Sequence, residues 1–321
     1  MDSIIASRED IRYAYRLLLG REPDAVGMRT FQAMVATGRV TAGDMAALIM
    51  SSAEFRARQG IDADCIEVGF DGYSMFVRAD DLDVGATVRN GTYEPQVVAA
   101  INEHLHVGAT VLDVGANIGY YTALAAHKVG PTGRVFAVEP MDKNLQLIYR
   151  TIWHNRFRNV QVLPFAASDA AQLLPMATTA RSSNGEVLPH DTQRAPSLFA
   201  QACVLDDLLP ALDRLDLVKI DIEGHEPHAW RGLARTLARH RPVVLTEFHP
   251  QCLRDNAHVD PIAYLATLFA YASSVQVLVD QGTRVACDRP DQVMQQWHVA
   301  DVRSGGRGDN HLDLLVHPAS A

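Results

Sequence analysis

A carboxylate directly before a glycine-containing turn is the first feature of this sequence that could do chemistry. Asp113 lies near the end of an apolar stretch, and the turn Gly115-Ala116-Asn117-Ile118-Gly119 follows it at once. Glycines let the backbone approach a ligand closely, and the amides that start the next helix face that ligand. A dinucleotide loop reads G-x-G-x-x-G, but here Asn117 takes the place of the second glycine. Asp113 would repel a pyrophosphate and attract the ammonium or sulfonium group of S-adenosylmethionine.

A second acid follows at the end of the next apolar segment. Glu139, with Pro140 after it, stands where a carboxylate clamps a ribose diol in nucleotide-binding sheets. NAD-binding proteins also carry an acid at this place, so Glu139 alone does not indicate which cofactor binds. It becomes informative together with Asp113 and the altered glycine turn. The three features together predict S-adenosylmethionine as the cofactor.

Titratable side chains also crowd the ends of two later apolar segments. Asp221, Glu223 and His225 lie within five residues of one another, and Glu247 stands near the end of the next segment, just before His249. Such groups could take the proton from a hydroxyl acceptor during methyl transfer, and a histidine has an ordinary pKa that suits this task near neutrality. Glu223 could equally cap the following helix. Asp221 and Glu247 could instead hold Mg²⁺, but two carboxylates do not define a metal site, and we predict no obligatory metal.

Apolar segments alternate with helical segments from residue 110 onward. This pattern predicts an α/β fold, a Rossmann-like seven-stranded class I methyltransferase sheet that is mostly parallel and has helices on both faces. Ligands bind beyond the carboxyl ends of such strands, which brings the acids described above to one edge of the sheet. We expect strands at residues 110–114, 134–139, 160–165, 217–221, 243–248, 274–279 and 311–316.

Two segments around these strands have a different character. Residues 65–80 alternate between apolar and polar side chains and predict a β-hairpin that turns near Asp71-Gly72. Residues 171–201 are polar and contain three prolines. We expect this second segment to be a long mobile loop, which could act as a lid over the site.

The first 60 residues predict short helices only. Ser7 and Asp10 have the spacing of a capping box, and apolar residues then recur at helical intervals. We expect residues 1–60 to form a separate helical bundle without catalytic groups, and residues 61–321 to form the methyltransferase domain.

Composition and charge exclude several classes of partner. The net charge of -9 disfavours nucleic acid, whose binding needs clustered Lys and Arg. The four cysteines lie far apart with no C-x-x-C pair, so neither a zinc site nor a disulfide framework is indicated, and a reducing compartment fits. No apolar run is long enough to cross a membrane, and the start of the chain does not read as a leader. We therefore expect a cytoplasmic protein.

Two parts of the sequence resemble known families. The stretches YEPQVVAAINEHLHVGATVLDVGANIGYYT, GRVFAVEP and LVKIDIEGHE resemble the FkbM family of S-adenosylmethionine-dependent O-methyltransferases, a similarity that runs from about residue 90 to the C-terminus. The phrases YRLLLGREPDAVGMRTF and LIMSSAEF resemble a phycobilisome-linker-like helical domain that occurs beside bacterial glycan-modifying enzymes. The second resemblance implies scaffolding or targeting through a protein partner. A structural cap on the main domain is the alternative for these helices.

The FkbM resemblance implies both a substrate and a set of site residues. It implies that the acceptor is a hydroxyl on a sugar, in a bacterial glycan or a glycosylated metabolite. A nicotinamide-dependent oxidoreductase and a non-catalytic binding or scaffold protein on the same fold are the alternatives. The turn after Asp113 would hold the methionine part, Glu139 the ribose, and Ser168 with Asp169 the adenine. The cofactor-binding residues implied are Glu94, Asp113, Gly115, Ala116, Asn117, Gly119, Thr122, Glu139, Pro140, Ser168, Asp169 and Asp221.

Overall fold

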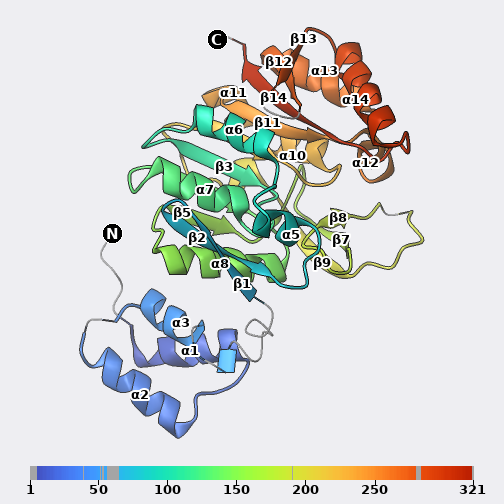
Figure 1. The fold of residues 1–321 in the computed structure, drawn as a ribbon. Coiled ribbons are helices and arrows are strands. Elements are labelled where there is room, and N and C mark those ends of the chain that lie inside the picture. Colours follow the sequence, from blue (N-terminus) through green and yellow to red (C-terminus); the bar gives the residue numbers. More distant parts are fainter. Residues whose placement is uncertain are drawn as a thin grey trace. The chain divides into compact units, whose positions relative to one another are not determined.

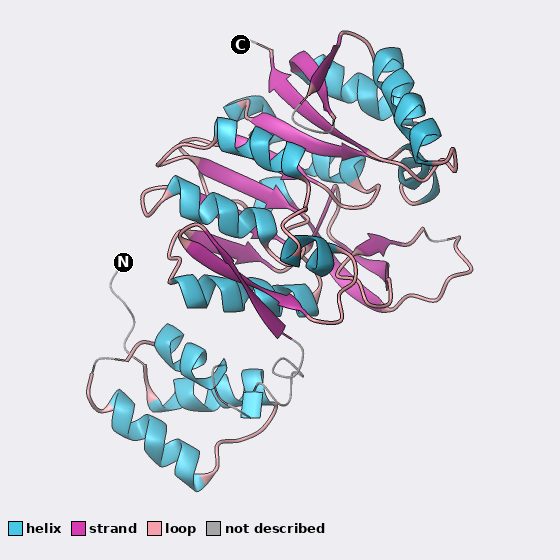
Figure 2. Ribbon diagram, in the orientation of Figure 1, coloured by secondary structure: helices cyan, strands magenta, loops and turns pink. Residues whose placement is uncertain are grey.

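The computed structural model of the chain describes residues 6–38, 40–50, 52, 54–55, 65–189, 191–279 and 283–319. They belong to two compact units, Met1–Ile66 and Glu67–Ala321, shown in Figures 1 and 2. The division falls at residue 66, where the sequence suggested residue 60. None of the described helices is long and apolar enough to cross a membrane.

The first unit consists of short helices around its own apolar core. Its helices are α1 (Arg8–Leu19), α2 (Ala25–Val35) and α3 (Ala42–Met50). The predicted capping box is present, because the Ser7 hydroxyl accepts from the Asp10 amide while the Asp10 carboxylate accepts from the Ser7 amide. The buried core side chains all come from this unit and include Ile11, Tyr15, Leu19, Met45 and Ile49.

The second unit is built on a mixed sheet of eight strands among the described residues. The order is β13-β12-β14-β11-β10-β3-β4-β5, and β14 runs antiparallel to both of its neighbours. All seven predicted strands are present, but the predicted strand number was one too low. The sheet comprises β3 (Thr110–Val114), β4 (Arg134–Val138), β5 (Val160–Leu163), β10 (Leu217–Ile220), β11 (Val243–Phe248), β12 (Ala272–Leu278), β13 (Arg284–Cys287) and β14 (Leu312–Pro318).

Helices pack against both faces of this sheet and bury it (Figure 2). Side chains of successive residues in a strand point to opposite faces, so Val111 packs with α6 (Pro95–His104) and α7 (Tyr120–Val129), while Leu112 packs against the other face. The remaining helices are α5 (Val84–Arg89), α8 (Asp142–Asn155), α9 (Leu205–Leu208), α10 (Glu226–Gly232), α11 (Ala234–His240), α12 (Pro250–Asp255), α13 (Pro261–Tyr271) and α14 (Pro290–Ser304). Burial on both faces holds the carboxyl ends of the parallel strands in fixed positions.

The predicted hairpin precedes the main sheet. Strands β1 (Cys65–Phe70) and β2 (Tyr73–Arg78) pair with each other, and the chain turns between them at Asp71 and Gly72. Gly72 has a φ of 86°, a backbone conformation that a glycine adopts without strain. The prediction of a hairpin at this place is confirmed.

The segment expected to be a mobile loop is instead part of a second sheet. Strands β6 (Ala166–Ser168), β7 (Gln172–Thr178), β8 (Gly185–Val187) and β9 (Leu198–Val204) pair in the order β6-β9-β7-β8. The prediction of a structureless loop over 171–201 was therefore wrong. The physical reason is a small apolar core, whose residues are spaced among prolines and polar residues in the sequence. This core is formed by Ala166, Leu174, Met176, Val187, Ala200 and Ala202.

We expect a chain that begins at Cys65 to fold without the first unit. Among the described residues, the apolar core of residues 6–55 and the main core are separate clusters, so each unit has an apolar core of its own. Thermal unfolding followed by tryptophan fluorescence tests this expectation, since Trp153, Trp230 and Trp297 all lie in the second unit. The shortened chain should unfold cooperatively within a few degrees of the full chain. A broad, non-cooperative transition would show that the two units depend on each other.

Candidate functional site

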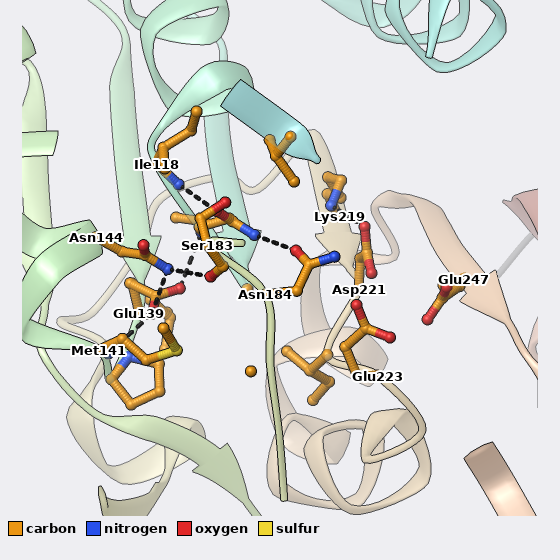
Figure 3. Close-up of a pocket in the computed structure, with 18 of the residues that line it drawn as sticks. Ile118, Glu139, Met141, Asn144, Ser183, Asn184, Lys219, Asp221, Glu223 and Glu247 are labelled. Carbon is orange, nitrogen blue, oxygen red and sulfur yellow. Dashed lines mark hydrogen bonds and ion pairs between the residues drawn. The ribbon is translucent and has the colours of Figure 1, made fainter. Parts of the chain in front are cut away.

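A cavity of about 300 Å³ lies at the carboxyl ends of β3, β4, β10 and β11. Figure 3 shows Glu139 and Asn144 on one side of it and Asp221 and Glu223 on the other. The fold thus brings most of the predicted site residues into one space. Those that line the cavity are Glu94, Gly115, Ala116, Asn117, Glu139, Pro140, Asp221, Glu223, His225 and Glu247.

The glycine turn after β3 lets two strand ends approach each other closely. Gly115 has a φ of 80°, and a Cβ atom there would lie 1.9 Å from the backbone oxygen of Asp221. Asn117 has a φ of 50°, a left-handed conformation that asparagine tolerates better than most residues. Its Oδ1 accepts a hydrogen bond from the Ile118 amide at 2.8 Å. Asn117 therefore replaces the glycine of a dinucleotide loop without losing the turn.

Glu139 is held between the glycine turn and the start of α8. One carboxylate oxygen accepts from the Asn117 amide at 2.9 Å, and the other accepts from the Met141 amide at 2.8 Å. Asn144 Nδ2 donates to the latter oxygen at 3.3 Å. Burial raises the pKa of Glu139 to about 7, against the lowering effect of these donors. The side chain is thus fixed in the position that the sequence suggested for a ribose clamp.

Residues 182–184, here called the strap, connect β7 to β8 and close one side of the cavity (Figure 3). Asn184 Oδ1 accepts from Asn117 Nδ2 at 2.7 Å, and Asn184 Nδ2 donates to Asp83 Oδ2 at 3.1 Å. Asn144 Nδ2 donates to the backbone oxygen of Ser183 at 2.9 Å. Sequence reasoning missed these contacts, although the Ser-Ser-Asn-Gly cluster marks the turn that makes them.

Asp113 does not line the cavity. Its carboxylate is 1% exposed and accepts from the Thr122 hydroxyl at 2.6 Å, while its Oδ1 has no hydrogen-bond partner. Burial raises the pKa of Asp113, and the charge of Lys219 opposes that rise. Gly119, with a φ of 88°, precedes α7 beside them. The structure therefore shows Asp113 and Thr122 bonded to each other behind the cavity lining, and their predicted role in holding the cofactor stays a prediction.

Ser168 and Asp169 also lie outside the cavity lining. Asp169 accepts from Arg231 Nε at 2.7 Å and lies 3.2 Å from His228 Nδ1. The Ser168 hydroxyl lies 3.1 Å from His225 Nε2. Both side chains thus have protein partners, and the neighbouring residues Phe165, Ala166 and Ala167 line the cavity. The contact of Ser168 and Asp169 with the adenine stays a prediction.

Lys219 is a site residue that sequence reasoning missed. It lies in β10, is 6% exposed, and its Nζ donates to Asp221 Oδ2 at 2.8 Å. The ammonium also lies 4.9 Å from the ring centroid of Tyr121, a cation–π contact. Burial lowers the pKa of Lys219, but Asp221, Asp113 and Glu94 together raise it above its usual range. The signal in the sequence was a lysine within the otherwise apolar stretch LVKI.

Glu94 enters the same cavity from the start of α6. It has a φ of 37°, makes no side-chain cap to the helix, and its Oε2 accepts from the Tyr121 hydroxyl at 2.5 Å. Burial, with the charges of Asp313 and Asp221, raises its pKa to about 7. Glu94 thus lines the cavity and does not cap the helix that follows it.

Glu223 and His225 differ in pKa, and therefore in how well each could act as a general base. Burial, with the charges of Asp221 and Glu226, raises the pKa of Glu223 to about 8. Burial and the charge of His228 lower the pKa of His225 to about 3, so its imidazole is neutral and weakly basic. A general base works best when its pKa lies near the working pH. Of these two candidates, which both line the cavity, Glu223 has the pKa that better suits a general base near neutrality.

No group of three or more His, Cys, Asp or Glu side chains is arranged to hold a metal ion in the part of the chain that the structure describes. Asp221 and Glu247, the metal ligands considered from the sequence, both line the cavity. Asp221 is paired there with Lys219.

Residues 113–269 match the family model of the methyltransferase FkbM domain. This part of the chain is therefore similar to the methyltransferase FkbM domain. The matched range contains the glycine turn, Glu139, Lys219, Glu223 and Glu247, so most of the cavity residues described above lie in the part that resembles the FkbM domain. Three other acids of the cavity, Asp83, Glu94 and Asp313, come from outside that range.

Individual proteins show more limited similarity to the chain. A protein-L-isoaspartate O-methyltransferase of Methanothrix thermoacetophila is 35% identical over 71 residues, which cover 22% of this chain and 34% of that protein. The chain thus spans about a third of the curated relative it matches. The crystal structure of methyltransferase FkbM from Methylobacillus flagellatus is 14% identical, with a TM-score of 0.41 over 94% of this chain and 58% of that one. A Streptococcus mutans methyltransferase in complex with SAH is 9% identical, with a TM-score of 0.38 over 69% and 97%.

Proposed function

We propose that the chain is an S-adenosylmethionine-dependent O-methyltransferase that methylates a hydroxyl group of a sugar, in a bacterial glycan or a glycosylated metabolite. The observation that carries the proposal is the position of Glu223. A carboxyl group with a pKa of about 8 shares one cavity with a glycine turn and a strand-end acid of the cofactor-binding kind. The FkbM family match supports methyl transfer.

The side of the cavity lined by the glycine turn, Glu139 and Phe165, here called the cofactor half, suits S-adenosylmethionine. Glu139 would accept hydrogen bonds from the two ribose hydroxyls, because hydroxyl donors compensate a buried carboxylate. The backbone of Gly115 and Ala116 would adjoin the methionine part, and Phe165 would adjoin the adenine. Glu94 is a buried acid that could accept from the ammonium group.

The side of the cavity lined by Asp221, Glu223 and Glu247, here called the acceptor half, supplies the group that takes up the proton. S-adenosylmethionine, held by Glu139 and the glycine turn, would supply a methyl group on a sulfonium whose sulfur is the leaving group. Glu223 accepts the proton of the sugar hydroxyl as the oxygen bonds to the methyl carbon, so charge and atoms balance without a further reactant. Asp221, held by Lys219, orients the acceptor hydroxyl toward the methyl group. Closure of the strap side keeps water out of the reaction.

Replacement of Glu139 by Ala is expected to weaken the binding of S-adenosylmethionine by about 1.5 to 3 kcal/mol, which raises Kd roughly 10- to 150-fold. The physical reason is the loss of charge-assisted hydrogen bonds to the ribose. Isothermal titration of the full chain with S-adenosylmethionine, S-adenosylhomocysteine and NAD measures this effect. Glu103→Ala, which removes a carboxylate that pairs with Arg284 outside the cavity lining, is the matched control. Tighter binding of NAD than of S-adenosylmethionine by the unaltered chain would overturn the proposed function.

A further inference from the structure

The cavity contains far more acids than cations. Among the described residues that line it, Lys219 is the one Lys or Arg, and it already pairs with Asp221. His249 and His311 are present as well, but burial lowers the pKa of His249. The cavity therefore has an excess of negative charge when its acids are ionised. The acids in the lining are Asp83, Glu94, Glu139, Asp221, Glu223, Glu247 and Asp313.

Two of these acids face each other directly across adjacent strands. Glu247 of β11 is paired in register with Asp313 of β14. Directly opposed residues of antiparallel strands place their side chains on the same face, about 5 Å apart at Cβ, and like charges in that position destabilise the sheet. Both side chains line the cavity. Figure 3 shows Glu247 beyond Asp221 and Glu223, on the side away from Glu139.

One carboxylate oxygen of the Glu247–Asp313 pair has no hydrogen-bond donor within the described residues. Glu247 is only 7% exposed, and its Oε2 has no hydrogen-bond partner. Its Oε1 lies 3.8 Å from Nδ1 of His311, an imidazole that is charged only when protonated. Asp313 accepts one hydrogen bond, from Gln96 Nε2 at 3.2 Å. A buried acceptor without a donor is costly, so a group that donates several hydrogen bonds and carries positive charge fits this place.

We propose that Glu247 and Asp313 form a binding site for an ammonium group of the acceptor, so that the substrate class is amino sugars, with the hydroxyl to be methylated held beside Glu223. This inference rests on the proposed function and names its substrate more closely. An ammonium group has three donors and one positive charge, which match the unpaired Glu247 oxygen and the opposed carboxylates. A neutral sugar hydroxyl donates one hydrogen bond and leaves the repulsion of the pair in place.

The same geometry predicts that amine binding releases a proton. Burial, followed by the charges of Asp221 and Glu223, raises the pKa of Glu247 well above its ordinary value, and burial also raises that of Asp313. Both shifts favour the protonated form of the pair in the free protein, whereas an ammonium group beside the two acids favours their ionised form. When the ammonium group enters, the carboxylates ionise and the proton leaves.

The inference is tested by titrating the full chain at pH 7 while it is saturated with S-adenosylhomocysteine. The titrants are glucosamine, N-acetylglucosamine and glucose. We expect glucosamine to bind at least tenfold more tightly than the two neutral sugars. Titrations in buffers of different ionisation enthalpy should show proton release with glucosamine alone. In the variants Glu247→Gln and Asp313→Asn the preference should fall to less than threefold, whereas Glu186→Gln, which removes a carboxylate paired with Arg194, should keep it.

Each outcome of this titration decides one point. Equal affinity for glucosamine and glucose, or a preference that survives in both acid variants, overturns the inference. Competition between glucosamine and S-adenosylhomocysteine overturns it too, because the amine would then occupy the cofactor half. Binding of Mg²⁺ that Glu247→Gln abolishes would assign the pair to a metal instead. Failure of S-adenosylhomocysteine itself to bind would refute the proposed function, which separates that failure from failure of the amino-sugar site.

Discussion

Replacement of Glu223 by Gln is expected to lower kcat by about 100- to 10,000-fold, the range found for general bases, while Kd for S-adenosylmethionine changes less than about threefold. Glutamine keeps the size of the side chain and the left-handed backbone at this position, where φ is 55°, but cannot accept the hydroxyl proton. Single-turnover kinetics with a methylated amino sugar as product measure the effect.

The pH dependence gives this prediction a second readout. Burial raises the pKa of Glu223 to about 8, so the side chain is largely protonated at neutral pH in the free enzyme. A base acts in its ionised form, so kcat/KM should rise about tenfold per pH unit below pH 8 and level off above it. The Gln variant should lose this rise.

Two further measurements could contradict the assignment of Glu223. His225→Gln is the matched control, and its turnover should stay within about tenfold of the unaltered chain, because a histidine with a pKa of about 3 is a poor base. Full activity of Glu223→Gln together with an inactive His225→Gln would reverse the two roles. Loss of activity in EDTA with rescue by Mg²⁺ would make Asp221 and Glu247 metal ligands.

Replacement of Lys219 by Met is expected to destabilise the second unit by about 3 to 5 kcal/mol, the usual loss when one partner of a buried ion pair is removed. Methionine fills similar volume, but it leaves Asp221 without its cation and Asp113, also buried, without the nearby positive charge. Urea unfolding followed by tryptophan fluorescence measures the change, since the three tryptophans report this unit alone.

A double variant distinguishes loss of charge from loss of packing. Lys219→Met combined with Asp221→Asn should regain about half of the lost stability or more, because the uncompensated carboxylate is removed as well. Lys143→Met, on the exposed face of α8, should change stability by less than about 0.5 kcal/mol. Equal losses in the single and the double variant would show that Lys219 contributes packing and not charge.

The central strands were predictable because each is an apolar run between helical segments, and burial on both faces requires such runs. β13 was missed because Arg284–Cys287 is a four-residue edge strand with a mixed sequence. The second sheet was missed for a different reason. Pro175 interrupts β7, and a proline within a run argues against a strand, yet the structure pairs it with Phe199 of β9.

The limits at the site concern the direction in which side chains point. Asp113 and Asp221 both occur near strand ends in apolar stretches, and in a doubly buried strand the sequence does not show which of them faces the cavity. Asp113 points to Thr122, whereas Asp221 lines the cavity. Likewise, the motif around His225 revealed a titratable group but not its burial, which decides its pKa. Residue types near the chemistry were thus predictable, and their protonation states were not.

The strap has a consequence for the rate at which products leave. Asn184 is hydrogen-bonded to Asn117 and to Asp83, and Ser183 is hydrogen-bonded to Asn144. A bound molecule that leaves the cavity through this side would have to break these hydrogen bonds. Motions of this kind take microseconds to milliseconds and set the overall rate of many enzymes. The strap would therefore give the spent cofactor a long residence time, and its opening, not the chemical step, would limit turnover at saturating substrate.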